Sequence, residues 1–312
     1  MVTATTGSVP KGLTRISFRT PADFNFWRTV LSHGWCSLPP FSFSPEDRHL
    51  DRILRLSDGS LASCRLSGDR DTVSILVTST LPLTSQQRRE VTQQLSTCLR
   101  LDEDLSPFHA EARKHPEHRW IAENHSGRLL RSPSVFEDII KMICTTNCTW
   151  SLTTLMVTNL VRHFGHAFHG THAAFPLPEA IARSTERYLR TQCKTGYRAP
   201  FLLELSRRIA GGKLDIESWR TSDLPTDELF NRLRDIKGVG PYAAGNILKL
   251  LGHYDYLGLD SWVRARYYTL HRRGRKVKDA TIEKHYAPYG RWRGLFFWLE
   301  MTKDWHEGKF AL

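Results

Sequence analysis

The first candidate for chemistry is a glycine-bearing turn that is followed, further along the chain, by a lone acid. Gly238 and Gly240 flank Val239, and Pro241 then opens an alanine- and leucine-rich stretch with helical spacing. Glycine permits positive φ and a close approach of the backbone to another molecule, and proline suits the first turn of a helix. The free amides at such a helix start can bind a phosphate. Asp260 opens the next helical stretch, where a fixed carboxylate can stabilise positive charge and orient or deprotonate water.

This pattern resembles the helix–hairpin–helix DNA glycosylase superfamily, in particular its 3-methyladenine and 8-oxoguanine branches. The resemblance rests on Gly-Val-Gly-Pro, the alanine-rich helix and an aspartate 20 residues after Gly240. It implies an enzyme of base excision repair that flips a damaged base out of duplex DNA, with Asp260 assisting water in hydrolysis of the N-glycosidic bond. It also implies contacts with the DNA backbone at Lys237, Gly238, Val239, Gly240, Tyr242, Arg264 and Arg266.

The position of the lysines bears on whether the DNA strand is also cut. In bifunctional members of the superfamily, a lysine at the start of the hairpin's second helix attacks the sugar and forms a Schiff base. Pro241 and Tyr242 occupy this region here, whereas Lys237 precedes the glycines and Lys249 lies about two turns down the helix. We therefore expect a monofunctional glycosylase without lyase activity.

Aromatic residues near the aspartate favour an alkylated base as the substrate. A cationic base such as 3-methyladenine leaves readily and is bound by stacking and cation–π attraction, for which the candidate rings are Tyr242, Trp262 and Trp298. From the resemblance to the 8-oxoguanine branch, the candidates for contacts with the opposite base or the gap are Asn147, Tyr197 and Arg198. Two alternatives stay open, an oxidised-purine (8-oxoguanine-type) glycosylase and a non-catalytic module that binds lesions in DNA.

Charge and cysteine content agree with a nucleic-acid partner inside the cell. The chain carries 44 Lys and Arg against 32 Asp and Glu, a net charge of +12, which favours double-stranded DNA over a membrane as the partner. The six cysteines form no dense framework and no long apolar run is present, so we expect reduced thiols in an intracellular, monomeric protein.

We expect no cofactor and no metal held by side chains, because the cysteines have no histidine or cysteine partners at metal-ligand spacing. Some relatives carry a four-cysteine iron–sulfur cluster near the C-terminus, but no cysteine follows Cys193 in this chain. The resemblance leaves open a monovalent cation held by backbone carbonyls of the hairpin.

The predicted fold class is α+β. Residues 1–12 are expected to be disordered, and residues 13–115 to form an N-terminal antiparallel sheet domain, since short runs such as TVSILVTS alternate apolar and polar residues. Helices are expected near residues 21–32 and 85–99. Residues 116–312 are expected to form a larger, all-helical body with two lobes and the hairpin at 235–252. Its first long helix should begin at Ser134, with a capping box to Glu137.

Overall fold

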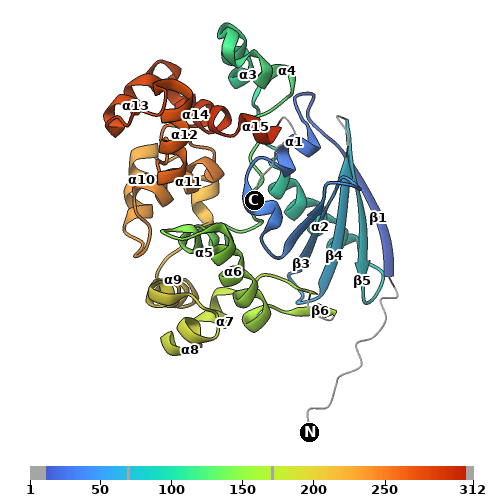
Figure 1. Ribbon diagram of the computed structural model, residues 1–312. Coiled ribbons are helices and arrows are strands. Elements are labelled where there is room, and N and C mark those ends of the chain that lie inside the picture. Colours follow the sequence, from blue (N-terminus) through green and yellow to red (C-terminus); the bar gives the residue numbers. More distant parts are fainter. Residues whose placement is uncertain (1–11, 69–70, 170–171, 307–312) are drawn as a thin grey trace.

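The computed structural model describes residues 12–68, 71–169 and 172–306. A five-stranded antiparallel sheet lies on one side of the molecule and helices make up most of the rest (Figure 1), so the predicted α+β class is confirmed. Most of residues 1–12, for which we predicted disorder, lie outside the described residues, and Gly12 begins the first strand. The domain limits predicted above stay a prediction.

The sheet has the strand order β1-β5-β4-β3-β2, with every neighbouring pair antiparallel. Val73, Ile75 and Val77 are buried while residues between them are more exposed, because successive side chains of a strand point to opposite faces. The strands are β1 (Gly12–Arg19), β2 (Phe41–Ser44), β3 (His49–Arg55), β4 (Leu61–Gly68) and β5 (Thr72–Ser79).

Two parts of this region differ from the prediction. The helix expected over residues 21–32 is only the short α1 (Phe26–Val30), because the Asn25 side chain accepts a hydrogen bond from the Arg28 amide and caps a helix that starts there. Strand β2 was missed because its four residues are too few for an alternating pattern to be recognised. The helix expected over 85–99 is confirmed as α2 (Ser85–Leu99).

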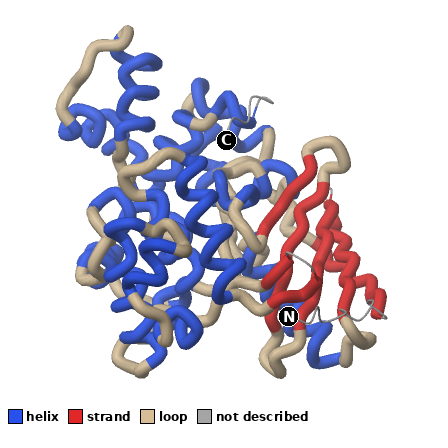
Figure 2. The backbone as a smooth tube through the Cα atoms, turned by 60° about the horizontal axis from the view of Figure 1, so that its bottom comes forward, coloured by secondary structure: helices blue, strands red, loops and turns tan. Residues whose placement is uncertain are grey.

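The helical body follows the sheet along the chain, and Figure 1 shows α10 to α14 above α5 to α9, while Figure 2 shows the strands gathered on one side of the helices. It also contains a two-stranded sheet of β6 (Ala167–His169) and β7 (His172–Ala173), so the prediction of an all-helical body was wrong in this detail. The helices nearest the hairpin are α10 (Thr226–Arg234), α11 (Pro241–Leu251) and α12 (Ser261–Arg272). The others are α3 (Ser106–Lys114), α4 (Arg119–Glu123), α5 (Val135–Thr145), α6 (Trp150–Phe164), α7 (Pro178–Ala182), α8 (Glu186–Thr191), α9 (Ala199–Ala210), α13 (Asp279–Tyr286), α14 (Arg293–Met301) and α15 (Lys303–His306).

A buried ion-pair cluster ties the sheet to helix α5. Glu137 of α5 pairs with Arg52 of β3 at 2.6 Å and with Lys141 at 2.7 Å, and all three side chains are almost fully buried. The predicted capping box is therefore only half right, since the Ser134 hydroxyl accepts from the Glu137 amide at 3.2 Å but the Glu137 carboxylate turns away to the cations. Glu217 supplies the remaining cap by accepting from the Val135 amide at 2.8 Å.

None of the helices in the described part of the chain combines the length and the apolar character needed to cross a bilayer.

Candidate active site and nucleic-acid interface

The hairpin between α10 and α11 depends on its two glycines in different ways. Gly238 has φ +89°, and a Cβ added to it would lie 2.7 Å from the ring of Phe201, so the turn excludes any larger residue there. Gly240 has φ −84° as the N-cap of α11, and a Cβ there would meet nothing within 4 Å. The absence of a side chain at Gly240 therefore leaves the backbone amides at the start of α11 open to a ligand.

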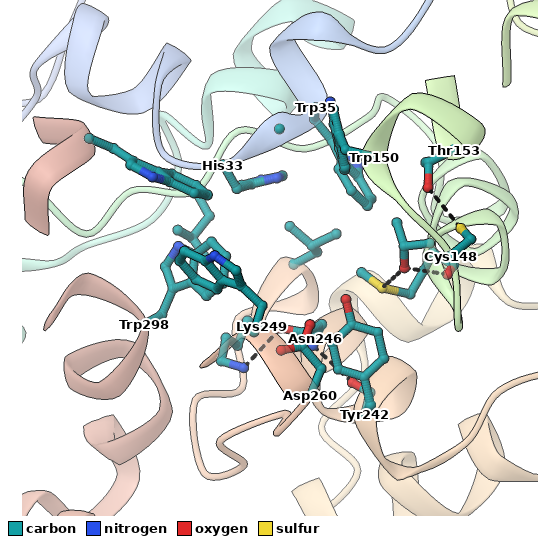
Figure 3. Close-up of a pocket in the computed structure, with 17 residues that line it drawn as sticks. His33, Trp35, Cys148, Trp150, Thr153, Tyr242, Asn246, Lys249, Asp260 and Trp298 are labelled. Carbon is teal, nitrogen blue, oxygen red and sulfur yellow. Dashed lines mark hydrogen bonds between the residues drawn. The ribbon is translucent and has the colours of Figure 1, made fainter. Parts of the chain in front are cut away.

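Asp260 is the N-cap of α12 and is partly exposed. Its Oδ1 accepts a hydrogen bond from the Val263 amide at 2.8 Å, which fixes the carboxylate relative to the helix. Figure 3 shows the Asp260 side chain beside Tyr242, Asn246 and Lys249, all of which come from α11. The hairpin helix and the capped carboxylate thus meet at one place.

An aromatic cavity of about 370 Å³ opens next to Asp260 (Figure 3). This volume lies within the roughly 300–1,000 Å³ of small-molecule sites. Its wall combines residues from the N-terminal region, α5, α6, α11, α12 and the C-terminal helices. The aromatic members of the wall are His33, Trp35, Trp150, Tyr242, Trp262, Trp298 and Trp305.

Hydrogen bonds hold the cavity wall in place. The Trp35 indole donates to Asp138 Oδ1 at 2.8 Å, and the Trp298 indole donates to the Ser32 carbonyl at 2.9 Å. Burial lowers the pKa of His33 to about 4, so its imidazole is neutral near pH 7 and its Nε2 donates to the Leu130 carbonyl at 2.5 Å. Burial, and then the charge of Asp260, raise the pKa of Tyr242 to about 12, so its phenol is neutral as well.

A second hollow, a groove of about 700 Å³, runs along the hairpin and α5. Lys237, Gly238 and Gly240 line it, together with Asn147 and Tyr197 from the other side. Four residues line both hollows, namely Thr145, Cys148, Tyr242 and Asp260. Asp260 therefore stands at the boundary between an aromatic cavity and a groove lined by exposed backbone.

The residues predicted to contact the opposite base or the gap do not all face this groove. Asn147 has φ +48° and its amide lies 3.5 Å from the Tyr197 hydroxyl, and Tyr197 is 47% exposed. Arg198 is only 3% exposed and its guanidinium donates to the Thr146 carbonyl. In this structure Arg198 supports the turn that carries Asn147. A contact of Arg198 with the opposite base stays a prediction.

The predicted backbone-binding cations are engaged in ion pairs. Lys237 is exposed beside the hairpin and pairs with Glu204 at 2.8 Å. Arg264 lines the groove while it pairs with Asp279 through two contacts of 2.8 Å. Arg266 pairs with Asp304. An exposed pair with a single contact, such as Lys237–Glu204, stabilises a protein little, so Lys237 can exchange its carboxylate partner for a phosphate at small cost.

The described residues contain no cluster of three or more His, Cys, Asp or Glu side chains suited to a metal ion. The family resemblance left open a monovalent cation held by carbonyls of the hairpin. Two of these carbonyls, those of Ile236 and Gly240, already accept backbone hydrogen bonds from the amides of Val239 and Ala244. The absence of a cofactor and the cation both stay predictions.

Several residues of the site were not found from the sequence. His33, Trp35, Trp150 and Trp305 lie far apart along the chain, and only the fold brings them to one cavity. Lys249 had been considered only as a distant lysine, but it lines the cavity next to Asp260. Its position seven residues after Tyr242, on the same helix face, was a usable signal.

The comparisons with known proteins confirm the resemblance to the helix–hairpin–helix DNA glycosylases, although no family model matches the chain. YfjP of Bacillus subtilis, provisionally named a DNA-3-methyladenine glycosylase, is 27% identical over 188 residues. This alignment covers 57% of the chain and 63% of YfjP, less than two thirds of that relative's length. A B. subtilis DNA-3-methyladenine glycosylase is 23% identical over 65% of the chain and 68% of its own length. The N-glycosylase/DNA lyase of Saccharomyces cerevisiae is 29% identical over 38% of the chain and 35% of its own length.

Solved structures agree on the fold. The 3-methyladenine DNA glycosylase from Archaeoglobus fulgidus superposes with a TM-score of 0.73 at 18% identity, covering 95% of this chain and all of that one. The apo-form of the Clostridium acetobutylicum 8-oxoguanine glycosylase/lyase gives a TM-score of 0.66 at 17% identity, covering 94% of this chain and 99% of that one. Sheet, helical body and hairpin thus form a fold that is shared by glycosylases of different base preference.

Proposed function

We propose that this chain is a DNA glycosylase of base excision repair, which flips a damaged base out of duplex DNA and hydrolyses its N-glycosidic bond. The observation that carries the proposal is the position of Asp260 between the aromatic cavity and the hairpin groove. A base in the cavity with its phosphates along the groove would bring the sugar next to this carboxylate. The relatives named as DNA-3-methyladenine glycosylases support the same activity.

Asp260 has the role of stabilising charge in this reaction. Cleavage of the glycosidic bond builds positive charge on the sugar, and a fixed carboxylate lowers the energy of that charge. The same carboxylate can orient a water molecule for attack on the anomeric carbon and accept its proton. The hydrogen bond from the Val263 amide holds one oxygen, and the other is free to act on the sugar and the water.

The hairpin has the role of holding the DNA backbone. The amides at the start of α11 have no side-chain cap, and the positive end of the helix dipole favours a phosphate at this point. The net charge of +12 adds long-range attraction, and the binding of double-stranded DNA should weaken steeply with salt.

The cavity favours an alkylated base. Its wall consists mainly of aromatic rings, and two of its titratable members, His33 and Tyr242, have pKa values that burial shifts so that both are neutral at pH 7. Aromatic faces attract cations, and a base such as 3-methyladenine or 7-methylguanine carries a positive charge. Trp262, Trp298 and Tyr242 are the rings we propose for stacking.

We further propose that the enzyme is monofunctional. Tyr242, with its neutral phenol, stands near the start of α11, where bifunctional members have a lysine. Lys237 pairs with Glu204 on the outside of the hairpin. Borohydride trapping of a covalent complex with damaged DNA would contradict this part of the proposal.

The experiment that tests the function is base release from duplexes that carry 3-methyladenine, 7-methylguanine, hypoxanthine or 8-oxoguanine, with and without an alkali step. The proposal expects alkali-dependent strand breaks at alkylated sites. Release of 8-oxoguanine alone would instead favour the oxidised-purine alternative. Tight binding of damaged duplexes without any release would favour the non-catalytic lesion binder.

A further inference from the structure

The floor of the aromatic cavity holds a buried amine that the reaction described above does not use. Lys249 lines the cavity but is only 2% exposed. Its Nζ donates to the Leu257 carbonyl at 2.8 Å and to Asn246 Oδ1 at 3.2 Å. An ammonium group has three donors, and these two acceptors are the hydrogen-bond partners of Nζ within the described ranges. The third donor has no acceptor among the residues that the structure describes.

The surroundings hold this amine in a defined orientation. The Asn246 amide nitrogen donates to the Tyr242 carbonyl at 2.9 Å, so its oxygen is the end that faces Lys249. Gly258 has φ +66°, and a Cβ added there would lie 3.0 Å from Nζ and 2.7 Å from the Asn246 amide nitrogen. The loop that covers the amine therefore requires glycine at this position.

The protonation of Lys249 is sensitive to pH near neutrality. Burial lowers its pKa to about 7, although the charges of Asp260 and Glu283 raise it. Glu283, on α13, is itself partly buried, faces Arg293, and has a raised pKa. Two other titratable groups of the cavity wall, His33 and Tyr242, are neutral in this range, since burial lowers the pKa of His33 to about 4 and raises that of Tyr242 to about 12. Near neutral pH, Lys249 thus exchanges between ammonium and amine while His33 and Tyr242 stay neutral.

We propose that Lys249 is a general acid that protonates a neutral purine base as it leaves, and that it thereby extends the substrates of this site beyond cationic alkylated bases. This inference rests on the proposed glycosylase function. The Nζ proton passes to a ring nitrogen of the purine, and the C1′–N9 bond breaks with its electron pair leaving on the base. Water adds to C1′ and loses its proton to Asp260, and the neutral amine regains a proton from solvent.

The geometry explains why the two kinds of base would respond differently to Lys249. A cationic base already carries the charge that makes it a good leaving group, so a further proton donor gives it little. The ammonium also repels such a base within the low-dielectric cavity. A neutral base such as hypoxanthine needs a proton on its ring to leave, and Lys249 is a residue of the cavity wall whose ammonium group can give one near pH 7.

The test is single-turnover release of hypoxanthine and of 7-methylguanine from matched duplexes between pH 6 and pH 9. Wild-type enzyme should lose hypoxanthine release by about tenfold per pH unit above about pH 7, while 7-methylguanine release stays level. Lys249→Met should lower hypoxanthine release at pH 6.5 at least tenfold relative to 7-methylguanine release, and it should remove the pH dependence of hypoxanthine release. Thermal unfolding, together with binding of a duplex that carries an abasic-site analogue, reports whether the variant is folded.

A second variant separates proton transfer from hydrogen bonding. Lys249→Gln keeps an N–H donor that cannot be transferred, so it should bind hypoxanthine duplexes as the wild type does and yet release the base slowly. Equal loss of both substrates in Lys249→Met, or wild-type rates for both, would overturn the assignment, as would a covalent complex trapped by borohydride through Lys249. Wild-type enzyme that releases 7-methylguanine but never hypoxanthine would overturn this inference alone, whereas release of no base at all would overturn the proposed function itself.

Discussion

Substitutions of the two hairpin glycines can distinguish a loss of contact with DNA from a loss of folding stability. Gly240→Ala adds a methyl group where the structure has nothing within 4 Å, at an ordinary φ of −84°. Its effect on stability is limited to the poorer N-cap, about 1 kcal/mol, or a fall in melting temperature of about 2–4 °C. If the amides of this turn bind a phosphate, however, the methyl group keeps the backbone of DNA at a distance.

The loss of binding can be given a magnitude. A hydrogen bond to a charged group contributes about 1.5–3 kcal/mol, so the loss of one such contact weakens binding by at least about tenfold. Gly238→Ala is the matched contrast, because its φ of +89° and the Phe201 ring 2.7 Å from the new Cβ disturb the turn itself. Gly238→Ala should lower the free energy of unfolding by about 1–2 kcal/mol because of the left-handed backbone, and by about 1–3 kcal/mol because of overpacking against Phe201.

The assay is fluorescence anisotropy with a duplex that carries a stable abasic-site analogue, at one fixed salt concentration, alongside thermal unfolding of each variant. Gly240→Ala should keep its melting temperature within a few degrees and bind at least tenfold more weakly. Gly238→Ala should lose both stability and binding. Wild-type affinity in a folded Gly240→Ala variant would refute the view that the hairpin backbone contacts DNA.

Three further predictions concern the cavity, the surface and the core. Trp262→Ala should lower the rate of 7-methylguanine release about two- to thirtyfold in single-turnover kinetics, since a cation–π contact contributes about 0.5–2 kcal/mol. Lys237→Met should lower the slope of log affinity against log salt by about 0.9 in a salt titration, because its pair with Glu204 is exposed. Glu137→Gln should cost about 3–5 kcal/mol of unfolding free energy by leaving Arg52 and Lys141 unpaired. Burial would raise the pKa of Glu137, but the charges of Arg52 and Lys141 hold it at about 2. The stabilising contribution of Glu137 should therefore be complete above about pH 4.5 and be lost as the pH falls towards 2. Acid unfolding experiments measure this loss.

The elements that the sequence predicted best are those fixed by local chemistry. The glycines and proline of the hairpin and the capping position of Asp260 depend on backbone preferences of a few adjacent residues. The alternating strands β3, β4 and β5 follow from the need to bury one face of the sheet. For the same reason the short β2 and the helix α13 escaped prediction, since neither has a strong periodic pattern.

The aromatic cavity could be predicted only in part because its wall is assembled from distant segments. Trp262 lies two residues after Asp260, and Tyr242 begins the hairpin helix, so both could be inferred from their neighbours. Trp35 and Trp150 reach the same cavity only because the N-terminal region and α6 pack together, with the Trp150 ring against Gly34. A single sequence does not show which of nine tryptophans converge.

The charged groups show the opposite difficulty, since the sequence identifies them but not their partners. Arg198 stood in a segment that resembles a base-contacting motif, yet its guanidinium is buried against the Thr146 carbonyl. Glu137 stood at the position of a capping box, yet the buried cations Arg52 and Lys141 attract its carboxylate more strongly than a backbone amide would. In both cases a partner far along the chain, Thr146 or Arg52, holds the side chain.

The measurement that tests the central claim most directly is single-turnover release of 7-methylguanine by the wild type and by Asp260→Asn. Asparagine caps a helix about as well as aspartate and can keep the hydrogen bond from the Val263 amide, so the variant should fold, unfold at nearly the same temperature and bind damaged duplex as tightly or more tightly. Without the carboxylate charge, base release should fall at least about a hundredfold. Base release by Asp260→Asn at the wild-type rate would contradict the assignment of catalysis to this site.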